Sequence, residues 1–226
     1  METIQSQPTR AAFTYLKAIY DCGDGTRFVT TSQLADYLDV APASVTAMSQ
    51  KLAAFNPPLL EYHKHHGVRL LPIGEQYALR IIRRHRLVET FLIQALGYSW
   101  DEVHEEAEEL DSCISPRLEE RLARYTGNPA FNPHGAPIPA DDLSLPQVAS
   151  IALDQLAAGQ KGLVNRVCSA DSGLLRYLSG LGVTLGALIE VVNCIPYDGT
   201  MHVRVNQTGD PVALGPTLTS VIMLAA

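Results

Sequence analysis

Apolar residues recur at helical spacing through the first third of the chain. In residues 10–21 they stand at positions 12, 15, 16, 19 and 20, which lie on one face of a helix. A second helix is expected over residues 32–39, capped by Thr31 or Ser32, and a third over residues 42–55 after a tight turn. Two short apolar runs, 59–62 and 68–71, then flank a polar turn and predict a hairpin. This order predicts a winged helix-turn-helix in residues 1–75.

The middle of the chain keeps the helical period. Residues 73–96 predict one long helix, which the sequence Gly-Tyr-Ser-Trp at 97–100 ends. Further helices are expected over 101–113 and 115–127, the second beginning with the favourable pair Ser115–Pro116. Residues 131–142 are too rich in proline and glycine to be helical. We therefore assign residues 76–145 to a helical domain and residues 146–157 to a linker.

Residues 158–226 change to short β-prone runs separated by turn residues. Five strands are expected within 162–170, 187–195, 199–206, 210–215 and 220–226, with one helical segment at 173–182. Strands of this number and length are typical of a small β-barrel. The predicted fold class is mainly α, with small β parts in the wing and at the C-terminal end.

Composition and charge narrow the possible functions. The formal net charge is −7, but residues 76–157 hold 13 acidic against 7 basic residues, while both flanking regions are nearly neutral. The excess of acidic residues is therefore concentrated in this middle stretch, which leaves nucleic-acid binding by the first domain open. No apolar run approaches the roughly 20 residues of a membrane span, and the polar beginning of the sequence predicts no secretory signal. Four cysteines without a Cys-x-x-Cys pair argue against a zinc ribbon and favour the cytoplasm.

The helical domain contains a regular pattern of imidazoles and carboxylates. His85 and Glu89 are four residues apart, His104 and Glu108 repeat this spacing, and Asp111 lies one turn further on. Residues at this spacing project from one face of a helix, so two facing helices can chelate a divalent cation with nitrogen and oxygen ligands. An acidic segment such as residues 101–110 is also typical of a solvated surface. The spacing by itself leaves both interpretations open.

Three consecutive segments resemble one protein family. The string RRHRLVETFLIQALGYSWDEVHEEAEELDSCIS at 83–115 resembles the metal-site signature of the diphtheria toxin repressor family, and FNPHGAPIP at 131–139 resembles the loop that closes its dimerisation region. Residues 174–205 are similar to the FeoA-like SH3 domains that many members carry. The resemblance implies a transcriptional repressor of metal homeostasis, which binds a palindromic DNA operator as a homodimer when loaded with Mn(II) or Fe(II).

The resemblance also assigns the metal ligands. It implies that His85, Glu89 and His104 form the family's ancillary site and that Glu108 and Asp111 belong to its primary site. The sequence departs from the family pattern at Ser112, where a histidine is usual, and at Thr14, where methionine or aspartate is usual. The family's barrel ligands fall near Ala170 and Gly173, which have no ligating side chain, with Asp171 as the nearest substitute. Cys113 is either a compensating ligand or a structural thiol.

The DNA-binding surface is expected on the third helix and the wing. The start of a recognition helix meets the base edges, and here it carries small, mostly uncharged residues. Because no arginine or lysine stands there for a bidentate guanine contact, direct readout should be modest and shape readout proportionately larger. The histidines of the wing, at positions 63, 65 and 66, either contact the phosphate backbone of DNA or belong to a solvated turn or an adventitious metal-binding patch. The candidate DNA contacts are Pro42, Ser44, Thr46, Gln50, Lys51, Lys64 and Arg69.

Two other functions remain as alternatives. A winged-helix regulator that has lost metal sensing would respond to another ligand or to the redox state of Cys113. A metal-dependent hydrolase would need an open coordination position and a general base, and no His-Glu-x-x-His signature is present. We therefore expect that the protein is not an enzyme.

Overall fold

The computed structural model describes residues 8–23 and 27–225. These residues form two compact units. Unit 1 consists of Met1–Arg84, Asp111–Cys113 and Asp141–Leu143, and unit 2 of His85–Leu110, Ile114–Ala140 and Ser144–Ala226, in each case where the structure describes them. The first seven residues, which contributed to the prediction that no secretory signal is present, lie outside the described residues.

Unit 1 contains the expected helix-turn-helix. Its helices are α1 (Arg10–Gly23), α2 (Thr31–Leu38), α3 (Pro42–Ala53) and the first part of α4 (Pro72–Leu96). The predicted cap of α2 was wrong by one residue, because Thr30 is the N-cap. Its side chain accepts a hydrogen bond from the backbone N–H of Gln33, and the Gln33 side chain accepts one from the backbone N–H of Thr30. This reciprocal capping box satisfies two N–H groups, which one-sided caps at Thr31 or Ser32 would not do.

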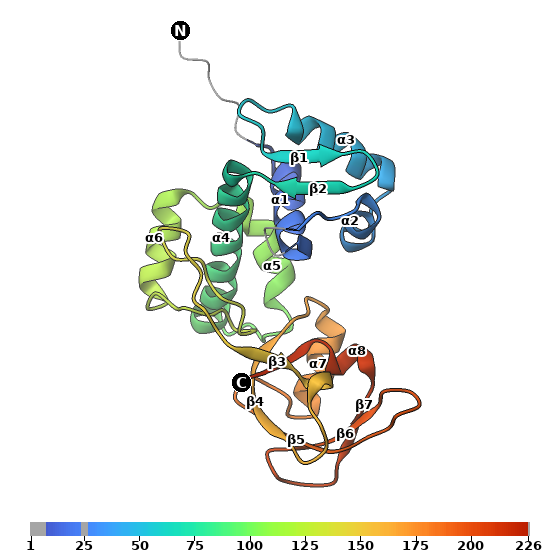
Figure 1. The fold of residues 1–226 in the computed structure, drawn as a ribbon. Coiled ribbons are helices and arrows are strands. Elements are labelled where there is room, and N and C mark those ends of the chain that lie inside the picture. The colour runs from blue at the N-terminus through green and yellow to red at the C-terminus, as the bar shows by residue number, and fades with distance from the viewer. Residues whose placement is uncertain (1–7, 24–26, 226) are drawn as a thin grey trace. The chain divides into compact units, whose positions relative to one another are not determined.

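The wing is a two-stranded antiparallel hairpin in the same unit. Strands β1 (Leu60–His63) and β2 (Gly67–Leu70) form this hairpin (Figure 1). Leu60 pairs with Leu70 across the two strands. Val29 adds a bridge to Val68 and so joins the hairpin to the segment before α2. Gly67 has φ +100°, and a Cβ there would lie 2.0 Å from the Val29 carbonyl oxygen, so the close approach requires glycine. The predicted winged helix-turn-helix is confirmed.

The helical part of unit 2 comprises the rest of α4, α5 (Val103–Leu110) and α6 (Pro116–Tyr125). The helix predicted over 101–113 is shorter, because α5 begins at Val103 and the chain turns into the 3-10 helix η1 at Asp111–Cys113. Helix α6 begins where predicted, with Ser115 accepting from the backbone N–H of Leu118. None of the helices that the structure describes is both long and apolar enough to cross a membrane.

The C-terminal part of unit 2 contains β3 (Ser150–Ala152), the 3-10 helix η2 (Leu153–Gln155), β4 (Lys161–Val167), β5 (Leu188–Cys194), β6 (Met201–Val205), β7 (Val212–Leu214), α8 (Pro216–Thr219) and β8 (Ile222–Ala225). The strands form a six-stranded antiparallel sheet in the order β3-β8-β4-β5-β6-β7 (Figure 1). Helix α7 (Ser172–Gly180) matches the helical segment predicted within the barrel. The predicted linker contributes strand β3 and the 3-10 helix η2, and β3 pairs with β8 at the edge of the sheet. A three-residue strand is too short to show an alternating pattern in sequence.

Candidate metal centre

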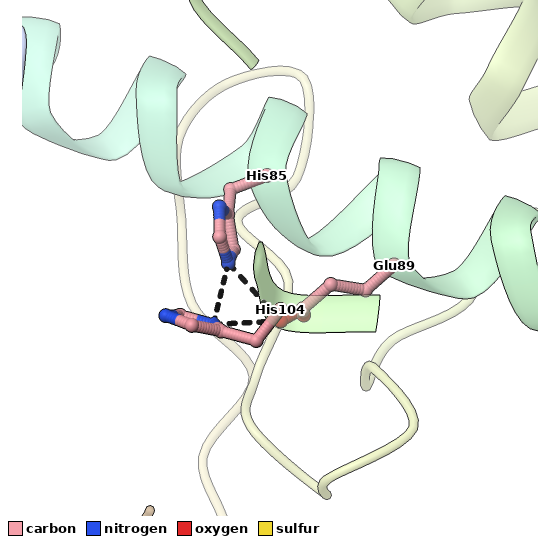
Figure 2. Close-up of side chains that lie close together, drawn as sticks. All are labelled: His85, Glu89 and His104. Atoms are coloured by element: carbon pink, nitrogen blue, oxygen red, sulfur yellow. Dashed lines mark hydrogen bonds and ion pairs between the residues drawn. The ribbon is translucent and has the colours of Figure 1, made fainter. Parts of the chain in front are cut away.

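Three of the predicted ligands converge in unit 2. His85 and Glu89 project from α4, and His104 faces them from α5 (Figure 2). The His85 Nε2 atom lies 3.0 Å from Glu89 Oε1 and 3.0 Å from His104 Nδ1, and His104 Nδ1 lies 3.2 Å from Glu89 Oε1. The three donor atoms all lie within 4.8 Å of one another, so one ion can contact all three.

The cluster is largely removed from solvent. His85 is 3% exposed and Glu89 is 1% exposed, whereas the His104 side chain keeps 23% of its surface accessible. Burial raises the pKa of Glu89, but the neighbouring rings of His85, His104 and His134 outweigh this effect and hold that pKa well below its ordinary value. Glu89 is therefore an anion at neutral pH, with His104 on the accessible side of the cluster.

This donor set fits a divalent transition metal. One carboxylate oxygen and two imidazole nitrogens are ligands that Mn(II), Fe(II) and Zn(II) all accept. Two ring nitrogens 3.0 Å apart can share only one hydrogen between them, and both also lie near the same carboxylate oxygen. A cation would bind all three lone pairs at once. The arrangement is therefore more typical of a metal site than of an ordinary buried ion pair.

A second group of side chains surrounds Glu89. Asn132 Nδ2 donates to Glu89 Oε2 at 2.5 Å, and the ring of His134 places Nδ1 3.8 Å from Glu89 Oε1. The other ring nitrogen of His134 donates to the Trp100 carbonyl oxygen at 2.6 Å. Neither residue was predicted from the sequence as a site residue, although both lie in the segment FNPHGAPIP, which carries part of the family resemblance. A histidine and an asparagine within a proline-rich segment were the only signal available in the sequence.

The other predicted metal residues lie outside this cluster. Glu108 Oε2 approaches the far nitrogen of His104, Nε2, at 3.8 Å, and its side chain is half exposed. Asp111 is buried in η1. The Thr14 hydroxyl donates to the Arg10 carbonyl of its own helix at 3.3 Å. Among the described residues, the structure thus gathers three of the five predicted ligands, and Glu108 and Asp111 as ligands stay predictions.

The predicted reading helix is exposed along its first turns. Pro42 occupies the first position of α3, and Ser44, Gln50 and Lys51 are exposed. Thr46 is half-buried, and its hydroxyl donates to the Pro42 carbonyl at 3.1 Å. The small residues expected at a DNA-facing helix start are therefore accessible, while Thr46 already has one partner within its helix.

The arginine of the wing is paired with a carboxylate. The Arg69 guanidinium donates to Glu61 at 2.7 Å and lies 4.8 Å from the centre of the Phe28 ring. Hydrogen bonds from His63 and then Arg69 lower the pKa of Glu61. This carboxylate therefore stays ionised and offsets part of the wing's positive charge. Lys64 is exposed in the turn between the strands.

Comparison with protein families finds three matches along the chain. Residues 9–68 match the iron-dependent repressor N-terminal DNA-binding domain, and residues 72–140 match the iron-dependent repressor metal-binding and dimerisation domain. Residues 151–226 match the FeoA domain. The second match contains His85, Glu89 and His104.

Individual relatives and solved structures agree with these matches. The chain is 26% identical to the iron-dependent repressor IdeR of Mycobacterium tuberculosis (strain ATCC 25618 / H37Rv) over 78% of its own length and 81% of that protein. It is 32% identical to the HTH-type transcriptional regulator MntR of Oceanobacillus iheyensis, over 48% of this chain and 71% of the relative. A manganese-dependent transcriptional repressor solved in complex with manganese is 34% identical. It superposes with a TM-score of 0.87, covering 95% of this chain and 99% of that one.

Proposed function

Since the chain belongs to the iron-dependent repressor family, whose members are metal-dependent transcriptional repressors and not enzymes, we propose that it represses genes of metal homeostasis. In this proposal it binds a palindromic operator as a cytoplasmic homodimer when loaded with Mn(II) or Fe(II). The observation that supports it best is the convergence of His85, Glu89 and His104 in the segment that matches the family's metal-binding domain. An intact three-donor cluster argues against a regulator that has lost metal sensing.

The residues proposed to hold the metal divide into two groups. His85 Nε2, Glu89 Oε1 and His104 Nδ1 form the first, because their donor atoms already converge. Glu108 and Asp111 form the second, in which Ser112 and Thr14 replace the stronger ligands implied by the resemblance. A bound divalent cation supplies the positive charge that lets two imidazoles and a carboxylate share one centre. The first group should therefore bind metal more tightly.

DNA binding is proposed to use α3 and the wing. Ser44, Gln50 and Lys51 are exposed on α3, and Lys64 is exposed in the wing turn. A twofold-symmetric dimer presents two such surfaces, which is why a palindromic operator is expected. Metal occupancy and operator binding are linked if the metal binds the DNA-competent conformation more tightly, and by the same linkage the operator then raises metal affinity.

The test is an operator titration followed by fluorescence anisotropy at fixed salt. Chelated protein is compared with protein loaded with Mn(II), Fe(II) or Zn(II), with the ionic strength held constant because salt alone changes such affinities by orders of magnitude. A gain in affinity with Mn(II) or Fe(II) is the expected result. If the titration curves were the same in all four conditions, only the winged-helix regulator that has lost metal sensing would remain.

Replacing Lys64 by alanine should weaken binding to all DNA sequences about equally. A lysine in the wing turn contacts phosphate, not bases, so the slope of log K against log salt should fall by about 1 per protomer. Lys161→Ala is the matched control, since its ammonium pairs with Glu190 at 3.3 Å within the barrel. A change in base preference without a change in salt slope would show that Lys64 does not act through phosphate.

A further inference from the structure

We propose that Asn132 is a positioning residue for the metal ligand Glu89, and that its loop, residues 131–137, transmits the state of the metal centre to strand β4 of the barrel. The inference rests on the proposed metal function of His85, Glu89 and His104. It assigns a role to residues that do not themselves belong to the three-donor cluster.

The amide of Asn132 can be oriented in only one way. Its oxygen accepts hydrogen bonds from the backbone N–H groups of His134 at 3.1 Å and Ala136 at 2.7 Å. The amide nitrogen, which can only donate, is thereby turned toward Glu89 Oε2, 2.5 Å away. Asn132 is buried, so solvent does not compete for these bonds. The side chain is locked by its own loop and holds one oxygen of Glu89.

The two oxygens of Glu89 consequently have separate partners. Oε2 is held by Asn132, while Oε1 faces His85 Nε2 and His104 Nδ1. A neutral amide fixes the carboxylate without cancelling its charge, whereas a lysine or arginine in this place would compete electrostatically with the cation. Partners of this kind orient a ligand before metal arrives, and their loss typically weakens metal binding about 10–100-fold.

The same loop is attached to the barrel. The His134 carbonyl accepts from the Val167 N–H of β4 at 2.9 Å. Gly135 has φ +81°, and a Cβ there would lie 2.0 Å from the Asn165 carbonyl oxygen, so the loop backbone is in close contact with β4. The Arg86 guanidinium, next to His85 on α4, donates to the Pro137 carbonyl at the end of the loop. A continuous path of hydrogen bonds therefore runs from Glu89 through Asn132 and His134 to Val167.

The ring of His134 supports the loop from its other side. Its Nε2–H donates to the Trp100 carbonyl, and the ring lies 5.8 Å from the Trp100 ring. Trp100 packs against the hydrophobic core of the barrel. The barrel therefore contacts the loop that holds Glu89. Ala170 and Gly173, near which the family's barrel ligands fall, have no ligating side chain.

The first test measures Mn(II) affinity by electron paramagnetic resonance of free Mn(II), with the full-length protein. Two variants are used. Asn132→Ala removes the whole amide, and Asn132→Ser keeps a hydroxyl that can accept from the backbone two residues on but is too short to reach Glu89. Both should bind Mn(II) about 10–100-fold more weakly than wild type. Asn193→Ala, which removes an exposed amide bonded to His202 in the barrel, is the matched control and should leave the affinity unchanged.

The outcomes separate this inference from the proposed function. If wild type binds no Mn(II), the proposed metal function fails. If His85→Ala binds Mn(II) as well as wild type does, the three-donor cluster is not the Mn(II) site, and the role of Asn132 falls with it. If wild type binds and His85→Ala does not, while both Asn132 variants bind like wild type, only the positioning role is overturned. If Asn132 had only a structural role, its variants would melt at a lower temperature in chelator, but Mn(II) would still stabilise them as much as wild type. That result would also overturn the positioning role.

The second test follows the barrel by hydrogen exchange. In wild type, Mn(II) should slow exchange of the Val167 amide, because its acceptor belongs to the loop that holds Glu89. In Asn132→Ser the slowing should disappear even at saturating Mn(II). If the exchange rate of the Val167 amide in wild type is the same with and without Mn(II), the proposed transmission to β4 is overturned.

Discussion

Replacing His85 by alanine is expected to abolish the gain in operator affinity that Mn(II) or Fe(II) gives the wild-type protein. Couplings of this kind correspond to about 5–150-fold in affinity. The effect should be nearly complete, because His85 Nε2 is 3.0 Å from both Glu89 Oε1 and His104 Nδ1, so one substitution removes the donor that both others face. The measurement is fluorescence anisotropy on one operator, with and without chelator.

Two controls make this result interpretable. His85→Gln preserves more of the buried volume and distinguishes loss of a ligand from collapse of the helical core. His202→Ala removes a histidine of the barrel that bonds Asn193 at 2.6 Å, outside the cluster, and should leave the metal response intact. A His85→Ala protein that folds and still responds to Mn(II) like wild type would contradict the assignment of this cluster as the sensor.

Replacing Gly67 by alanine is expected to destabilise unit 1 and weaken operator binding while leaving Mn(II) binding unchanged. The residue has φ +100°, a conformation that costs other residues about 1–3 kcal/mol. The new Cβ would also overlap the Val29 carbonyl, which is bridged to Val68 in the wing. Urea denaturation followed by circular dichroism measures the stability. Electron paramagnetic resonance of free Mn(II) measures metal binding, which should persist because the residues of the three-donor cluster all belong to unit 2.

Gly209→Ala is the matched substitution. Gly209 also has a positive φ, +69°, but its added Cβ would meet no atom within 4 Å. This substitution should lower the free energy of unfolding by about 1–2 kcal/mol, because alanine is strained in the left-handed backbone conformation. It should have no effect on operator affinity. If Gly67→Ala were no more destabilising than Gly209→Ala, the close contact between the wing and Val29 would not matter for stability.

Local features of the chain could be predicted because they depend on neighbours in sequence. The helical period placed α1, α3, α4 and α6 to within a few residues, and Ser115–Pro116 marked the start of α6. The spacing of His85 and Glu89 indicated a shared face of one helix. Features that depend on a few contacts between residues far apart in the sequence could not be predicted in the same way. Strand β3 is only three residues long and is defined by its pairing with β8.

The amino-acid sequence by itself determined the order of the modules and the residue types available to bind a divalent ion. Only the tertiary structure decided which side chains meet. Glu89 and Asn132 are 43 residues apart, and the bond between them exists because a loop without regular structure packs beside α4. In the wing, Arg69 faces Glu61 across a strand pair, so this predicted DNA contact already has an acidic partner. Such encounters depend on packing and strand register, which neither helical spacing nor composition specifies.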